Sequence, residues 1–145
     1  MQTVSLNPTV LLKNAHLKVT RARQELLTNF NEFDRPFTAD DVCSKLQVSG
    51  GGVHRATVYR DMSTFARSGI LKELSIHGTK AHYYELVDGT HHHHFVCKNC
   101  ISITAILSEK VETTLEKFEH ELTQQELKVE YHSLKFYGLC ARCAK

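Results

Sequence analysis

Residues 91–100 read HHHHFVCKNC, so a run of four histidines leads directly into a Cys-x2-Cys pair. A second pair of the same spacing, Cys140 and Cys143, stands near the C-terminus. Thiolates bind zinc strongly, and two such pairs, with Cys97 and Cys100 as the first, predict a tetrahedral four-thiolate site. The 39 residues between the pairs exceed the roughly 15–20 of a zinc ribbon, so a folded domain must bring the second pair back. Two separate redox pairs are disfavoured, because neither pair opens a helix after a strand.

The histidine run predicts further metal sites. Alternate side chains of a strand point to opposite faces, so His92 and His94 would face one way and His91 and His93 the other. One short strand could then supply two metal sites with two imidazoles each. An expression tag is disfavoured by the internal position of the run. A solvated histidine-rich loop is the remaining alternative.

Composition sets the broad class. A chain of 145 residues with 41% hydrophobic and 23% charged residues is typical of a soluble globular protein with one domain or two small ones. Because there is no membrane-length apolar run and no signal-peptide pattern, we expect a cytoplasmic protein with no membrane partner. Metal-bound or free cysteines suit such a reducing compartment, and Cys43, outside the pairs, is expected in the core. The net charge of +2 does not decide whether nucleic acid is bound.

Residues 1–87 have the pattern of a winged helix-turn-helix domain. We expect helices over 9–15, 20–33, 38–46 and 53–68, followed by strands over 70–76 and 81–87. Thr38 opens the third helix with a capping box in which Asp41 replaces the usual Glu or Gln, and Gly69 ends the fourth in a left-handed conformation. The helix over 53–68 would be the recognition helix, with its first residues toward the DNA major groove. A small helical domain whose basic residues are merely solvated is the alternative.

Residues 88–90 are the expected hinge, and residues 91–145 form the second expected domain. Strands are predicted over 95–96, 101–107 and 128–137. A helix over 108–123 would carry Val111, Leu115, Phe118 and Leu122 on one face. Together the two halves predict an α+β fold with an N-terminal winged-helix domain and a small α/β domain that holds metal.

The sequence resembles the ferric uptake regulator family of metal-dependent repressors from about Leu17 to Cys143. The matching elements are, in chain order, Leu17-Lys18-Val19-Thr20 with Arg23, Ala56-Thr57-Val58-Tyr59-Arg60, Glu85 before the histidine run, His91 to His94 with Cys97 and Cys100, and His132-Ser133-Leu134 before Tyr137-Gly138-Leu139-Cys140. Each element is weak alone, but their order and spacing together are specific.

The resemblance implies three metal sites. The structural zinc site would be formed by Cys97, Cys100, Cys140 and Cys143. A regulatory site between the two domains would use Glu85, His92 and His94. A third site inside the dimerisation domain would use His91, His93, Glu112 and His132, with His93 standing where many members have Asp.

The resemblance also implies a DNA interface and a dimer. Lys18 matches a residue that reaches the DNA minor groove, and Tyr59 and Arg60 match contacts of the recognition helix. The full expected set of DNA-contacting residues is Lys18, Arg23, Arg55, Thr57, Tyr59 and Arg60. The expected partners are therefore double-stranded DNA with a promoter palindrome and a second copy of the chain, with no small-molecule substrate.

Two departures bear on the metal that is sensed. Many iron- and peroxide-sensing members supply a regulatory histidine from the DNA-binding domain where this chain has Pro36, and a carboxylate expected after the first cysteine pair is Ala105 here. Glu73, His77 and His82, in the wing, are the candidates to complete the site. Many imidazoles and few carboxylates favour a Zn²⁺ sensor, with Fe²⁺, Mn²⁺ or peroxide sensing and Ni²⁺ as alternatives.

The function expected is metal-dependent repression of metal-uptake genes, without enzymatic activity. A zinc deaminase would need His-x-Glu upstream of Pro-Cys-x-x-Cys, which this sequence lacks. A metal storage or delivery module without DNA binding is disfavoured by the winged-helix half.

Overall fold

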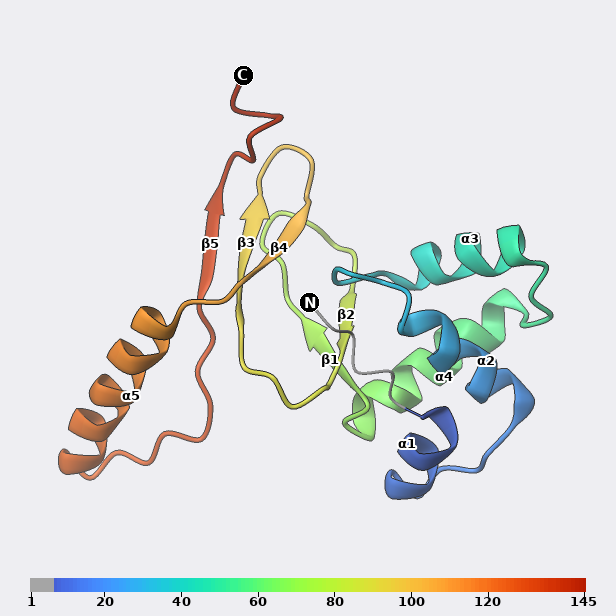
Figure 1. Cartoon of the computed structure of the whole chain (residues 1–145), viewed down its shortest axis with the longest axis horizontal. Helices are drawn as coiled ribbons and strands as arrows, with labels where there is room; N and C mark the ends of the chain where they lie inside the picture. Colours follow the sequence, from blue (N-terminus) through green and yellow to red (C-terminus); the bar gives the residue numbers. More distant parts are fainter. Residues whose placement is uncertain (1–6) are drawn as a thin grey trace. The chain divides into compact units, whose positions relative to one another are not determined.

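A computed structural model describes residues 7–145 and separates the chain into two compact units between Thr90 and His91 (Figure 1). The first unit is a group of helices followed by a hairpin, and the second combines a three-stranded sheet with one helix. The expected α+β class is confirmed. Within residues 7–145, no helix combines the length and the apolar character needed to cross a membrane.

Within residues 7–90, the first unit has four helices followed by two antiparallel strands. Its elements are α1 Pro8–Asn14, α2 Arg21–Phe30, α3 Ala39–Ser49, α4 Arg55–Arg67, β1 Leu71–Leu74 and β2 Tyr83–Leu86. Residues at helical spacing on α2, α3 and α4 form one core, which includes Leu26, Leu27, Phe30, Val42, Leu46, Val58, Met62 and Phe65. The edge of the Phe30 ring meets Phe65 with 6.0 Å between centroids, so the core joins α2 directly to α4.

The ends of these helices are set by local chemistry. The Thr38 hydroxyl accepts from the Asp41 N–H, and the Asp41 carboxylate accepts from the Thr38 N–H, which confirms the capping box. α3 runs past the expected Leu46 to Ser49, because the left-handed residue that ends it is Gly50. Gly69, with φ of 76°, follows α4 as expected.

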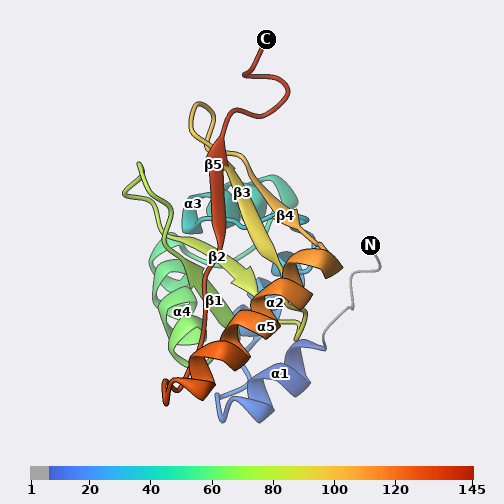
Figure 2. The ribbon, with the colours of Figure 1, turned by 90° about the vertical axis from the view of Figure 1, so that its left-hand side faces the viewer.

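The second unit is built around its central strand. Its elements are β3 His93–Cys97, β4 Ile103–Ile106, α5 Glu109–Gln124 and β5 Lys135–Gly138. The sheet order is β4-β3-β5, with β3 antiparallel to β4 and parallel to β5 (Figure 2). A parallel neighbour requires a crossover, which α5 provides. The register pairs Cys97 with Gly138, so both cysteine pairs lie at the same end of the sheet.

Several sequence-based strand boundaries were wrong. The hairpin strands expected over 70–76 and 81–87 are the shorter Leu71–Leu74 and Tyr83–Leu86. The strand expected over 128–137 is formed only by Lys135–Gly138, because β3 offers partners from His94 onward and residues 128–134 have none there. The strand expected over 101–107 starts at Ile103, since Ile101 has φ of 55° and turns the chain within the cysteine loop.

Candidate functional site

The four paired cysteines meet at one end of the second unit's sheet. Their sulfur atoms all lie within 4.8 Å of one another, and Cys100 Sγ is 3.8 Å from Cys140 Sγ. Tetrahedral zinc with Zn–S bonds of about 2.3 Å places its sulfurs about 3.8 Å apart. The four thiols therefore fit a zinc ion in both number and spacing.

Backbone hydrogen bonds around Cys97 favour the thiolate form of its side chain, which is the form that binds metal. Cys97 is the last residue of β3 and is completely buried. The Cys140 N–H donates to Cys97 Sγ over 3.4 Å. Hydrogen bonds from the backbone of Cys100 first, and of Cys140 second, lower the pKa of Cys97 to about 6. A thiol that ionises readily is a good zinc ligand.

The histidine run is divided by the alternation of β3. The ring centroids of His92 and His94 lie 4.9 Å apart, and those of His91 and His93 are also 4.9 Å apart. His93 and His94 are buried, with 2% and 3% of their surface exposed. β3 and the two residues before it thus present two separate imidazole pairs.

The pair His91 and His93 is joined by residues from α5 and from the segment before β5. His91 Nε2 is 2.9 Å from His132 Nε2, and Glu112 Oε1 is 3.0 Å from His93 Nε2. Among the described residues, His93 Nε2 is buried without a directed hydrogen bond, although Glu112 is near. Burial, which outweighs the opposing effect of Glu112, lowers the pKa of His93 and so favours the neutral imidazole. A neutral, unsatisfied imidazole nitrogen fits a metal ligand.

Glu119 completes this cluster, and sequence reasoning did not find it. Its Oε1 lies 2.5 Å from Nδ1 of His132. Glu119 follows Glu112 by two helical turns, so it shares the same face of α5. That periodicity was the available signal. The expected role of Glu112 did not predict where the segment that carries His132 would run, so the contact with Glu119 was missed.

The residues expected at the regulatory site lie in both units. Glu85, on β2, is 3.7 Å from Lys72 Nζ, whereas His92 and His94 belong to the second unit. In the wing, His82 contacts Glu73 directly, and His77 lies in the loop between β1 and β2. Ala105 stands directly opposite His94 on β4. Antiparallel neighbours have Cβ atoms about 4.5–5.5 Å apart, so a carboxylate at position 105 would lie beside His94. That ligand is missing from this chain.

At the start of α4, two of the expected DNA contacts share one carboxylate. Asp40 Oδ1 accepts from Arg55 over 2.5 Å and from the Tyr59 hydroxyl over 2.8 Å. The Arg55 guanidinium carbon lies 5.2 Å from the Tyr59 ring centroid. The hydrogen bond from Tyr59 is the largest effect that lowers the pKa of Asp40, and the same bond raises the pKa of Tyr59. α3 thereby holds both side chains in one exposed arrangement.

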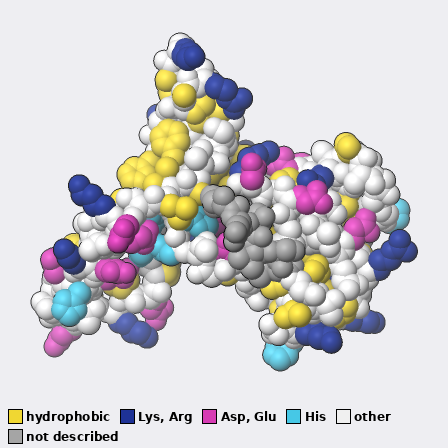
Figure 3. Space-filling model, in the orientation of Figure 1, with side chains coloured by type: hydrophobic (Ala, Val, Ile, Leu, Met, Phe, Trp, Pro, Cys, Tyr) yellow, Lys and Arg dark blue, Asp and Glu magenta, His cyan; other side chains and the backbone are white. Residues whose placement is uncertain are grey.

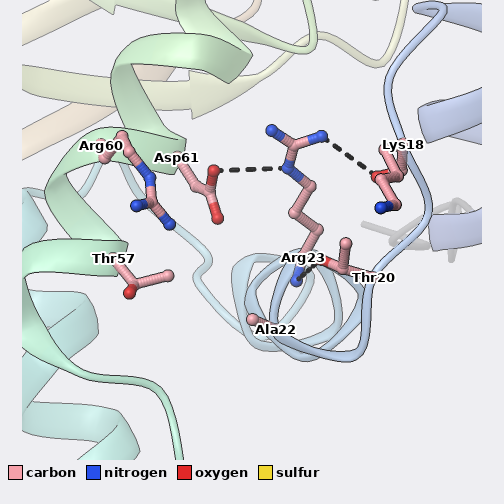
Figure 4. A pocket seen from close by; sticks show the side chains of 7 residues that line it. All are labelled: Lys18, Thr20, Ala22, Arg23, Thr57, Arg60 and Asp61. Atoms are coloured by element: carbon pink, nitrogen blue, oxygen red, sulfur yellow. Dashed lines mark hydrogen bonds and ion pairs between the residues drawn. The ribbon is translucent and has the colours of Figure 1, made fainter.

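A pocket between α2 and α4 collects the other expected DNA contacts (Figure 4). It is lined by Lys18, Thr20, Ala22, Arg23, Thr57, Arg60 and Asp61. Arg23 donates to the buried Asp61 over 3.3 Å and to the Lys18 carbonyl over 3.1 Å. Arg23 therefore links the two helices and the backbone at Lys18, while Lys18, Thr57 and Arg60 are the remaining expected contacts in the pocket.

Comparison with known proteins connects these features. A sequence profile described as "Ferric uptake regulator family" matches residues 14–137. A "Ferric uptake regulation protein" of Bordetella parapertussis is 34% identical over 136 residues, which cover 92% of this chain and 94% of that protein. A "Peroxide operon regulator" of Bacillus subtilis is 30% identical and covers 92% and 89%. The ferric uptake regulator of Francisella tularensis, solved with iron, has a TM-score of 0.75 and 32% identity and covers 89% and 96%.

Proposed function

Because the chain belongs to the ferric uptake regulator family of metal-responsive transcriptional regulators, which are not enzymes, we propose that it represses metal-uptake genes as a metal-loaded homodimer on a promoter palindrome. The observation that carries the proposal is that one chain combines a helical unit whose α4 carries exposed arginines with a unit of clustered thiols and imidazoles.

The second unit supports the homodimer. α5 has no buried residue, and Phe118 on it is 55% exposed. Figure 3 shows apolar side chains gathered on the surface of this unit. Phe136 and Tyr137 on β5, and Leu139 just after it, are exposed. Soluble monomers rarely expose contiguous apolar surface of this kind. A second copy of the unit would cover it, and would fix two winged helices at the spacing of two half-sites.

Two kinds of evidence bear on which metal is sensed: the names of the related proteins and the ligand residues of this chain. The names of the relatives support Fe²⁺ as the first metal to test, which reverses the order expected from the donor set alone. Zn²⁺ is the second candidate. Ala105, opposite His94, offers no carboxylate oxygen, and Pro36, in the first unit, offers no imidazole nitrogen, although iron-type members have these ligands.

We assign three roles to the metal ligands. The four cysteines would hold structural zinc, and His91, His93, Glu112 and His132 would form the third site. Glu85 from the first unit, with His92 and His94 from the second, would hold the sensed metal. Ligands from two units make domain arrangement depend on metal, so metal shifts the population of arrangements that fit DNA. Glu73, His77 and His82 are the candidates to complete this site.

The test is metal-dependent binding to promoter DNA. His92→Ala with His94→Ala should give a folded dimer with its structural zinc but without metal-stimulated DNA binding. His91→Ala with His93→Ala is the matched control, and should lose mainly dimer stability. Titration of the parent with Fe²⁺, Mn²⁺, Zn²⁺ and Ni²⁺, repeated for Glu73→Ala, His77→Ala and His82→Ala, identifies the metal and any completing ligand. Undiminished metal stimulation in the first double variant would refute the assignment.

A further inference from the structure

His132 joins its cluster from outside the histidine run. His93 belongs to β3 and pairs with Ile106 of β4, and His91 stands two residues earlier in the same run. His132 lies in the irregular segment between α5 and β5. Its Nε2 nevertheless faces His91 Nε2 over 2.9 Å, and its ring centroid lies 5.4 Å from that of His93. A side-chain contact must therefore orient the ring.

Glu119 makes that contact from the opposite side of the ring. Its Oε1 is 2.5 Å from Nδ1 of His132, within hydrogen-bond reach of that ring nitrogen. An Nδ1–H that donates to a carboxylate leaves the proton off Nε2, so the lone pair of Nε2 points at the cluster. Histidines that bind metal commonly donate their other N–H to a carboxylate in this way.

We propose that Glu119 is a positioning residue of the third metal site. It holds His132 in the tautomer protonated on Nδ1 and fixes the orientation of its ring. This inference rests on the third site of the proposed function. Glu112 and Glu119 then have different roles, although they lie on the same face of α5. Glu112 reaches the imidazoles of His91 and His93 directly, whereas Glu119 acts through His132. The two carboxylates would also balance the charge of a divalent ion at this cluster.

The experiment uses full-length protein carrying His92→Ala and His94→Ala, with zinc in the four-cysteine site. Added Co²⁺ then reports the third site through its visible absorption, and titration against a competing chelator gives its affinity. Glu119→Ala should weaken Co²⁺ binding about 10–100-fold. Glu119→Gln keeps an oxygen that accepts from Nδ1–H, so it should lose less than about tenfold. Glu116→Ala, at an exposed position on the same helix, is the matched control and should bind like the background.

A second readout separates positioning from folding. The Nδ1–H proton of His132 should be slow to exchange in the metal-loaded background and in Glu119→Gln, and fast in Glu119→Ala. An unchanged Co²⁺ affinity in Glu119→Ala would overturn this inference but leave the third-site assignment standing. Equal losses in the Gln and Ala variants would make Glu119 a direct ligand and overturn it as well. If the background binds no Co²⁺ at this site, the third-site assignment fails and the inference with it.

Discussion

Arg60 and Arg23 line the same pocket of the first unit but have different surroundings. Arg23 is tied to the buried Asp61 and to the Lys18 carbonyl, so its guanidinium holds α2 against α4. Arg60 follows Tyr59 on α4 and is exposed at the pocket. A basic side chain on the surface can meet a phosphate, whereas one committed to an internal carboxylate chiefly stabilises the fold.

Arg60→Ala should weaken DNA binding without changing metal content or dimerisation. Each phosphate contact removed lowers the slope of log affinity against log salt by about one unit. The measurement is DNA affinity at several salt concentrations, with Arg67→Ala, in the last turn of the same helix, as the control. An unchanged salt slope in Arg60→Ala would place the phosphate contact elsewhere.

Arg23→Ala should lower the free energy of unfolding. It leaves the carboxylate of Asp61, 3% exposed, without its guanidinium partner, which typically costs about 1–3 kcal/mol. Denaturant unfolding of the parent and variant measures this loss. Arg35→Ala is the control, because the pair of Arg35 with Asp41 is open to solvent and its loss should cost less than about 1 kcal/mol. Equal losses of unfolding free energy in the two variants would contradict a structural role for the Arg23–Asp61 pair.

At the level of the strand, β3 and β4 decide which ligands meet. The alternation of β3 separates the four histidines into two pairs, and the register with β4 chooses the neighbour of each. His94 has Ala105 beside it. A methyl group offers metal no ligand, so the metal preference of this face depends on a cross-strand position distant from the histidines in sequence.

Ala105→Glu should therefore raise the affinity for Fe²⁺ and Mn²⁺ relative to Zn²⁺. A carboxylate adds a hard oxygen ligand and a negative charge beside His94, and these favour octahedral ions. The measurement is the ratio of activating concentrations in metal-stimulated DNA binding. Thr104→Glu is the control, because it pairs with Phe95 and points to the other face. If both variants change the ratio equally, charge alone is responsible.

For the molecule as a whole, the two units differ in how they are held together. The first has a shared apolar core drawn from all four helices. Within the described part of the second, only Val96, Cys97 and Ile103 are buried apolar residues. So small a core contributes little stability, and a metal site supplies folding free energy directly.

Cys140→Ser, or removal of zinc by a strong chelator, should unfold the second unit and abolish dimerisation while the helices of the first unit persist. Zinc content, oligomeric mass and residue-resolved NMR would show this separation. Cys43→Ala is the control, since Cys43 lies in the core of the first unit and should leave zinc in place. A variant Cys140→Ser that keeps its zinc and its dimer would refute the structural role.

Much of this protein was readable from local sequence pattern. The capping box at Thr38, the left-handed Gly69, the core faces of α2 to α4 and the division of the histidines follow from helical and strand periodicity, which neighbouring residues carry. The Asp40 contacts, the link from Arg23 to Asp61, the late start of β5 and the approach of Glu119 to His132 do not. They join residues far apart in sequence, and their distances depend on how the helices and strands pack, which periodicity along the chain does not encode.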